Sequence, residues 1–324
     1  MTCSLEDTLA GDRDLLARAV AWADCPTLGE CAGPRMARTA REQGIEFATA
    51  LLYDRVLRCA GNGAFFQQVK ASRRPVVNDP PLIGLIPGAF YLEHKNTGAD
   101  GAQLAAVLQS MNCRVERVPV ESFGSLGRNA TIIADWLSRH RRDRVAFITL
   151  SKGSADLKIA LGLPNAAELF RNVDVWMSLS GLSEGTPLVA WLRRQPWRKL
   201  GVGLLLRLRG QRYSVVEELR QEPGGPLTTW PAVPARLRLI HILSFPLRRH
   251  LAHPWAARGF DRLAPLGPND GGGFLLSDKA KLPGTVFPIW GADHYLQPDW
   301  DVTALLRRIF VEALSPPADL RQAT

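Results

Sequence analysis

The chain has 324 residues, of which 46% are hydrophobic, and a formal net charge of +9; this is the composition of a soluble globular protein, long enough for one large domain or two ordinary ones. No apolar run approaches the roughly 18 residues of a membrane span, and the first residues lack a signal-peptide pattern, so we expect a cytoplasmic protein with no membrane span. The arginine-rich clusters match no nucleic-acid motif, so we do not expect a nucleic-acid partner. The five cysteines do not have the spacing of a zinc site, so we do not expect a metal.

Residues 1–78 show helical spacing of apolar side chains and no catalytic constellation, so we expect an N-terminal helical extension packed on the main domain. From residue 79 onward, short apolar runs alternate with helical patterns. The strands are predicted over residues 82–88, 113–120, 144–150, 173–180, 237–247 and 284–290, and the helices over residues 98–111, 129–140, 154–163 and 302–314. This alternation predicts an α/β fold with a mostly parallel central sheet and helices on both faces.

Two segments depart from the alternation. Residues 186–230 hold three tryptophans, much of the arginine and a Pro-Gly-rich loop, which indicates an insertion that could serve as a helical lid. Residues 317–324 are mostly polar and predict a flexible tail. The main domain is therefore expected over residues 79–316, and the sequence predicts no particular oligomeric state.

Two serines are candidates for a nucleophile. The only literal Gly-x-Ser-x-Gly is GLSEG at residues 181–185, and this pattern is the sequence form of a nucleophile elbow. An elbow needs a strand, a sharp turn that carries the serine, and a helix directly after it. The stretch FITLSKGSADLKIAL supplies this context around Ser151, with Gly153 two positions later, although Thr149 stands where the pattern has glycine.

Roughly residues 80–315 resemble the α/β-hydrolase superfamily, and in particular its lipase- and esterase-like serine hydrolases. The resemblance rests on the loop LIPGAF after an early strand and on the turn at Ser151 two helix–strand units later. It implies that Ser151 is the nucleophile, because Ser183 comes one unit too late and is expected to be a turn residue near the rim. Ser125, which has Phe123 two positions before it, is a weak third candidate.

The same resemblance implies the chain order serine, acid, histidine for the catalytic residues. His294 follows the last predicted strand, where this fold delivers its base, whereas His241 lies inside a strand and is expected in the core. For the acid we choose Asp270, whose Asp-Gly pair resembles the acid loop of lipase-like members. Asp278 and Asp261 remain alternatives.

The oxyanion hole is expected to use two backbone N–H groups. One belongs to Lys152, the residue after the nucleophile, and the other to Ala89 in the Pro-Gly-Ala-Phe loop. The Lys152 side chain would either add positive potential at the mouth of the site or point to solvent.

Together these residues predict a serine hydrolase that cleaves a carboxylic ester or thioester through an acyl-enzyme on Ser151, without a metal or an organic cofactor. The alternatives are an acyltransferase or a carrier thioesterase on the same site, and a non-catalytic scaffold with a hydrolase fold. The expected substrate is a small acyl ester or thioester, and the basic insertion leaves an anionic or carrier-bound substrate open.

Overall fold

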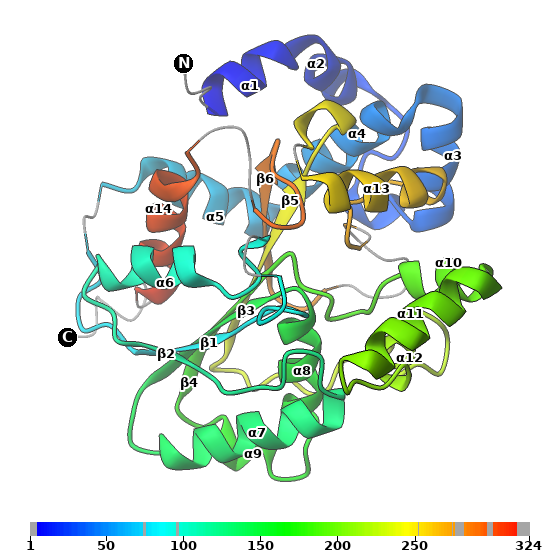
Figure 1. The fold of residues 1–324 in the computed structure, drawn as a ribbon. Helices are drawn as coiled ribbons and strands as arrows, with labels where there is room; N and C mark the ends of the chain where they lie inside the picture. The colour runs from blue at the N-terminus through cyan, green and yellow to red at the C-terminus, as the bar shows by residue number, and fades with distance from the viewer. Residues whose placement is uncertain are drawn as a thin grey trace.

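The structure is a computed structural model, and the residues it describes are 5–73, 76–94, 97–251, 253–273, 275, 282–296 and 301–315. Helices surround a central sheet on both sides (Figure 1). Across the described residues, no helix combines the length and the apolar character that crossing a membrane would require.

Within the described residues, six parallel strands form one sheet. The strands are β1 (Leu82–Ile86), β2 (Val115–Arg117), β3 (Val145–Leu150), β4 (Val173–Leu179), β5 (Arg238–Phe245) and β6 (Thr285–Trp290). Their order across the sheet is β2-β1-β3-β4-β5-β6. Because the strands are parallel, their carboxyl ends meet at one edge, where ligands bind in open α/β sheets. The predicted parallel sheet with helices on both faces is confirmed.

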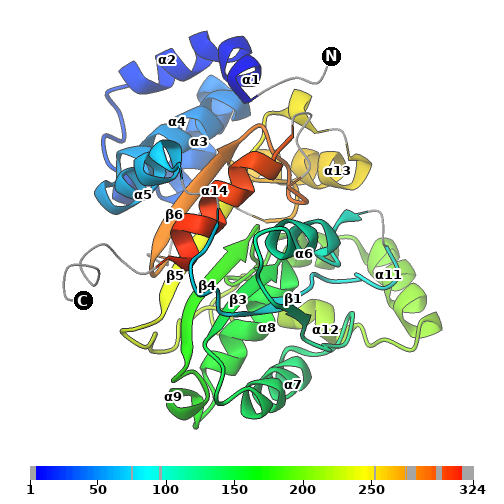
Figure 2. The same cartoon turned by 90° about the vertical axis from the view of Figure 1, so that its left-hand side faces the viewer.

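Both faces of the sheet are covered because successive residues of a strand point to opposite sides. Ile83 and Leu85 of β1 join a core with α5 (Ala60–Ala71), α6 (Ala102–Gln109) and α14 (Thr303–Leu314). Figure 2 shows α6 and α14 in front of the sheet. Leu82 and Ile86 of β1 join a second core on the other face. The helices of that core are α7 (Leu126–Arg139), α8 (Lys152–Leu161) and α9 (Ala166–Leu169).

The N-terminal helices pack on the β5–β6 end of the sheet. They are α1 (Leu5–Gly11), α2 (Arg13–Ala21), α3 (Gly33–Gln43), α4 (Ile45–Arg58) and α5. Phe47 and Leu51 of α4 share a hydrophobic core with Phe245 of β5 and Trp290 of β6. Asp12, between α1 and α2, accepts a hydrogen bond from Trp290 Nε1 at 2.6 Å. The segment is thus helical and buried against the main sheet, while its division at residue 78 as a separate domain stays a prediction.

The segment predicted as an insertion leaves the sheet after β4 and returns before β5. It contains α10 (Leu188–Arg193), α11 (Pro196–Leu208) and α12 (Ser214–Glu218). The turn just before the insertion and the end of the insertion are held together, because the Lys158 ammonium of α8 donates to the carbonyl oxygens of both Ser183 and Leu227 at 2.8 Å. The insertion is therefore anchored at both ends on the helix that follows Ser151.

Several predicted boundaries differ from the structure. The strand expected over residues 113–120 is only three residues long, and β2 lies at an edge of the sheet. The helix expected from residue 154 begins at Lys152, and the one expected from residue 129 begins at Leu126. The remaining helices are α13 (Pro254–Leu263) and the 3₁₀ turns Leu28–Glu30, Arg248–His250 and Ala264–Leu266. The tail predicted over residues 317–324 lies outside the described residues.

Candidate active site

The turn between β3 and α8 is sharp and holds Ser151 in a rare backbone conformation. Ser151 has φ 47° and ψ −116°, and α8 begins at the next residue. Non-glycine residues seldom adopt a positive φ, and such strain is typical of functional turns. The Ser151 N–H donates to the Leu179 carbonyl at 3.1 Å, and the Ser151 carbonyl accepts from the Leu182 N–H at 2.9 Å. The first bond reaches the last residue of β4 and the second reaches the loop after it, so the neighbouring strand and its loop fix the turn.

The residues that flank Ser151 explain why one position of the pattern is glycine and the other is not. A Cβ at Gly153 would lie 2.6 Å from the Pro87 carbonyl oxygen, so only glycine lets α8 start this close to the end of β1. Thr149 is buried, and its Oγ1 accepts a hydrogen bond from Trp176 Nε1 at 2.9 Å. It also lies 2.7 Å from Ser154 Oγ. Threonine therefore fills and bonds a space that glycine would leave empty.

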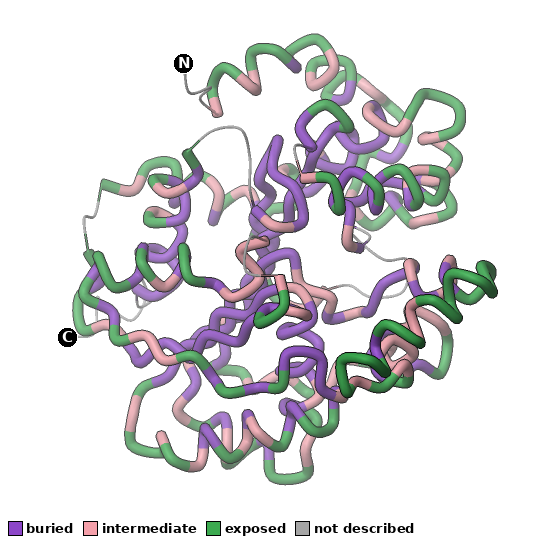
Figure 3. The backbone as a smooth tube through the Cα atoms, viewed as in Figure 1, coloured by how far each residue is buried: buried purple, intermediate pink, exposed green. Residues whose placement is uncertain are grey.

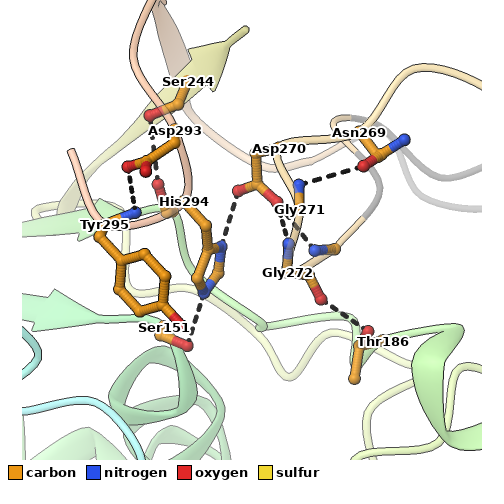
Figure 4. A network of polar contacts seen from close by, with 12 residues as sticks. Ser151, Thr186, Ser244, Asn269, Asp270, Gly271, Gly272, Asp293, His294 and Tyr295 are labelled. Carbon is orange, nitrogen blue, oxygen red and sulfur yellow. Dashed lines mark hydrogen bonds and ion pairs between the residues drawn. The ribbon is translucent and has the colours of Figure 1, made fainter. Parts of the chain in front are cut away.

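The loop after β6 brings His294 to this turn (Figure 4). His294 Nε2 lies 2.9 Å from Ser151 Oγ, and His294 Nδ1 lies 2.8 Å from Asp270 Oδ2. The other carboxylate oxygen of Asp270 accepts from the N–H groups of Gly272 and Gly273 at 2.9 and 2.8 Å. Three residues that are far apart in the sequence thus form one continuous chain of hydrogen bonds.

The acid loop fits closely against the histidine ring. A Cβ at Gly272 would lie 2.4 Å from His294 Nδ1, so a side chain at that position would displace the ring. The Gly272 carbonyl accepts from Thr186 Oγ1 at 2.7 Å, and the His294 N–H donates to the Asp270 carbonyl at 2.9 Å. The loop is therefore tied both to the start of the insertion and to the loop that carries His294.

The surroundings of His294 favour its protonated form. Burial by itself lowers the pKa of the imidazole, but the charge and hydrogen bond of Asp270, together with the charge of Asp293, more than reverse this, so that the pKa of His294 is raised. Because Nδ1 faces a carboxylate, it carries a proton, and Nε2 of the neutral ring is then an acceptor that faces Ser151. The ring is thus oriented to take a proton from the serine.

Two backbone N–H groups were predicted to form the oxyanion hole, those of Lys152 and Ala89. Lys152 is the first residue of α8, so its N–H has no partner within the helix. The Pro-Gly-Ala-Phe loop lies against the turn, since a Cβ at Gly88 would be 3.4 Å from Ser151 Cβ. Neither the Lys152 nor the Ala89 N–H donates to another group in the part of the chain that the structure describes. Both are therefore available to a bound oxygen.

Neither a protein-family model nor a curated protein sequence matches the chain. Solved structures do. A metagenomic carboxyl esterase matches with a TM-score of 0.58 and 18% sequence identity, over 94% of this chain and 98% of the esterase. The chain has an α/β-hydrolase fold. A Bacillus licheniformis lipase in its propeptide form matches with a TM-score of 0.50 and 18% identity, over 76% of this chain and 53% of the lipase.

In this α/β-hydrolase fold, the Lys152 side chain neither points to solvent nor lies free at the mouth of the site, which were the two positions expected from the sequence. The side chain is buried, and its ammonium lies 2.7 Å from Asp156 Oδ1, one helical turn further along α8. Asn129 of α7 donates to the other carboxylate oxygen at 3.0 Å. Burial raises the pKa of Asp156 to about 6, against the opposing charge of Lys152. The sequence did contain a signal for this pair, because Asp156 follows Lys152 by four residues.

Ser183 is held in a different environment. The residue is buried and lines a cavity of about 20 Å³ together with His241 and Asp270. That volume suits one water molecule and is too small for an acyl group. The Ser183 carbonyl accepts from the Lys158 ammonium. The contacts of Ser183 are therefore those of a turn that anchors the insertion.

The other candidates from the sequence lie away from this hydrogen-bond chain or outside the described residues. Ser125 caps α7, because its Oγ accepts from the Arg128 N–H. Asp261 is an exposed ion-pair partner of Arg248, at 2.7 Å. Asp278 lies outside the described residues. Thr186, which binds the acid loop, was not identified from the sequence, where it gave no signal beyond its place in the insertion.

Proposed function

We propose that this α/β-hydrolase fold is a serine hydrolase that cleaves a carboxylic ester, with Ser151 as the nucleophile, His294 as the general base and Asp270 as the orienting acid. The observation that carries the proposal is the hydrogen-bond chain from Ser151 Oγ through both nitrogens of His294 to Asp270. A serine hydroxyl is a weak nucleophile, and a histidine held by a carboxylate is the arrangement that activates it. The carboxyl esterase with which the chain shares its fold supports this reading.

The proposed reaction follows from this geometry. His294 Nε2 takes the proton as Ser151 Oγ attacks the acyl carbonyl, and Asp270 stabilises the imidazolium without accepting its proton. The protonated histidine then donates to the leaving alcohol, or to the thiol of a thioester. A water molecule, deprotonated by the same histidine, releases the acid from Ser151. These steps use only groups of this chain and the solvent.

We assign the oxyanion hole to the N–H groups of Lys152 and Ala89. Lys152 follows Ser151 directly, and the loop that contains Ala89 lies against the Ser151 turn. Neither N–H donates elsewhere within the described part of the chain. Removal of one donor from such a site typically lowers the rate by about 10²–10³-fold. The buried pair of Lys152 and Asp156 supports this assignment indirectly, because it holds the first turn of α8 in place.

The insertion over residues 186–230 is proposed to be the lid of this site. Leu206 of α11 and Val215 of α12 pack with Phe123, and Ala89 and Phe90 of the oxyanion loop pack against the same cluster. The insertion therefore contacts the loop that would bind the oxyanion. Its inner side chains would help to shape the acyl pocket.

A fluorophosphonate probe tests the proposal, since it reacts with activated serines. The wild-type protein, Ser151→Ala and Ser183→Ala are labelled under the same conditions, and mass spectrometry locates the adduct. We expect an adduct on Ser151 in the wild type and in Ser183→Ala, and none in Ser151→Ala. An adduct on Ser183, or no labelling of the folded wild type, would contradict the proposal. Supplying a primary alcohol or a thiol with the ester then distinguishes acyl transfer from hydrolysis by the product formed.

A further inference from the structure

Helix α11 exposes large apolar side chains to solvent. Trp197 is 83% exposed, Leu208 77%, Leu200 65% and Leu204 59%. The helix lies at the periphery of the molecule, and Figure 3 shows it as exposed along most of its length. Single exposed leucines are ordinary on protein surfaces, but a continuous apolar patch marks a site of interaction.

The exposed side chains form one stripe along the helix. With about 3.6 residues per turn, Trp197, Leu200, Leu204 and Leu208 project from the same side. The opposite side already has a partner, because Leu206 is buried against Phe123 and Val215. Helix α11 is thus apolar on two opposite sides, and a helix of this kind is normally covered on both.

The charged residues of α11 are all positive. Helix α11 contains Arg198, Lys199 and Arg207 and no acidic residue. Counting about 100° per residue, Arg198 and Arg207 lie on the two flanks of the stripe, while Lys199 lies on the inner side, where its ammonium is 5.3 Å from the Tyr213 ring. The stripe therefore has a basic border on each side.

The neighbouring helix α13 extends the basic border. Arg262 of α13 and Arg198 both stack on the Trp191 ring, at 4.3 and 5.1 Å. Arg258 lies one turn before Arg262 on the same helix, and both are exposed. Trp255, at the start of α13, is also an exposed aromatic side chain. The apolar stripe and the cationic border together form one surface, which we call the α11 face.

We infer that the α11 face docks this protein on an anionic lipid surface. In this arrangement the stripe from Trp197 to Leu208 enters the boundary between headgroups and acyl chains, and the flanking arginines bind the lipid phosphates. A helix with Trp and Leu on one side and basic residues beside them has the composition of helices that lie in the membrane interface. Anionic lipids supply the negative charge that the border requires.

A second copy of this chain fits the α11 face less well. In a two-fold dimer the same patch meets itself, so the arginines on one α11 would face those on the other. Like charges placed together across an interface oppose association. An anionic lipid surface satisfies both the apolar stripe and the basic border, and it accommodates a helix that projects from the edge of the molecule.

The test measures binding to vesicles by flotation in the Ser151→Ala background, so that the proposed hydrolase activity neither consumes the lipid nor decides the result. Vesicles of phosphatidylcholine alone are compared with vesicles of equal parts phosphatidylcholine and phosphatidylglycerol. We expect binding to the mixed vesicles that weakens as salt rises from about 0.1 M to about 1 M, where the Debye length falls from roughly 10 Å to 3 Å. Binding that does not distinguish the two vesicles, or no binding to either, would overturn the inference.

Two pairs of substitutions test the two parts of the face. Leu204→Glu with Leu208→Glu, and separately Arg198→Glu with Arg207→Glu, should each lower the affinity for the mixed vesicles by about tenfold or more. The matched controls are Val20→Glu on α2 and Arg142→Glu after α7, which are exposed and lie outside the face. An equal loss in the controls would contradict a specific site. So would a dimer in analytical ultracentrifugation that Leu204→Glu with Leu208→Glu dissociates, because the face would then bind a second copy.

Discussion

The turn after β3 and the turn after β4 lie at the same edge of the sheet, and each carries a serine two residues before a glycine. In the first turn, Ser151 has a positive φ, a helix starts at the next residue, and His294 lies within hydrogen-bond distance. In the second, Ser183 is buried, its carbonyl binds Lys158, and no helix begins before Leu188. Only the second turn carries the literal motif.

The glycines of the literal motif have structural reasons of their own. A Cβ at Gly181 would lie 2.4 Å from Ser154 Oγ of α8, and Gly185 has φ +82° with the Leu219 carbonyl 2.6 Å from the position of a Cβ. They let the turn after β4 pack between α8 and the returning end of the insertion. In this chain, close packing explains the glycines of the literal motif, whereas the backbone conformation of Ser151 and its contact with His294 support Ser151 as the proposed nucleophile.

The largest effect on catalytic rate should come from Ser151→Ala, for which Ser183→Ala is the comparison. Ser151→Ala should lower kcat/KM for a soluble short-chain ester by at least ~10⁴-fold, because the nucleophile is gone. Ser183→Ala should keep kcat/KM within about threefold of the wild type, since no hydrogen bond among the described residues joins its hydroxyl to the chain from Ser151 through His294 to Asp270. Initial rates over a range of ester concentrations give both values. If Ser183→Ala lowered kcat/KM more than Ser151→Ala did, with the melting temperature unchanged, Ser183 rather than Ser151 would be the nucleophile.

The fit of the acid loop against His294 predicts a smaller effect at Gly272. Gly272→Ala places a Cβ 2.4 Å from the imidazole, so the ring must move away from Ser151. A displacement of this kind should lower kcat by about 10²-fold, because proton transfer depends on close alignment. Gly273→Ala is the control, since its Cβ would meet only the flexible Leu182 side chain, at 3.0 Å. Equal rates in the two variants would show that the loop does not position the ring.

Writing the literal motif around Ser151 should reduce stability without improving activity. Thr149→Gly leaves the buried Trp176 N–H without its acceptor and removes a buried methyl group. Together with the flexibility of glycine in a strand, this should lower the free energy of unfolding by roughly 2–4 kcal/mol. Thr149→Ser keeps the hydroxyl and should cost less than about 1 kcal/mol. Urea unfolding measures both, and an unchanged midpoint for Thr149→Gly would refute this account of the threonine.

The smallest effect concerns pH. The base must be neutral to accept a proton, and the pKa of His294 is raised by Asp270 and Asp293, so kcat/KM should fall as pH drops through a midpoint above the ordinary histidine value. Asp293→Asn removes one of the two charges and should move that midpoint to lower pH by about half a unit. Asp261→Asn, on the surface beside Arg248, should leave the midpoint unchanged. A shift to higher pH in Asp293→Asn would exclude this electrostatic role.

The sequence predicted the strands well for a physical reason. Apart from β2, the strands are buried on both faces, so they stand out as continuous apolar runs between helical patterns. The candidate site residues could be proposed for a related reason. Parallel strands deliver their following loops to one edge of the sheet, and Ser151 and His294 each follow such a strand. The glycines after Asp270 indicated close backbone approach, which the structure shows as two N–H groups on its carboxylate.

Features that depend on pairing between distant segments could not be predicted in this way. Lys152 comes directly after the predicted nucleophile, a position from which an exposed side chain at the mouth of the site was expected. Only the packing of α7 and α12 over α8 explains why this side chain is buried. The leucines of α11 have the spacing that is typical of a buried helix face, yet most of them are exposed. Periodicity alone does not reveal which side of a helix packs against a partner. The placement of the N-terminal helices is also a pairing, between residues at opposite ends of the chain.

The packing of α4 against β5 and β6 has a consequence for the order in which this protein folds. The N-terminal helices leave the ribosome first, but the strands that complete their core are made last, and the bond between Asp12 and Trp290 joins residues 278 positions apart. At typical rates of synthesis, these helices wait on the order of tens of seconds for their partner. During that interval the sides of Phe47 and Leu51 that pack on β5 and β6 lack their native partners, although Phe47 can already contact Trp22. Forming a contact between residues so distant in sequence is slow. Until it forms, the nascent chain is most prone to aggregation and most dependent on chaperones.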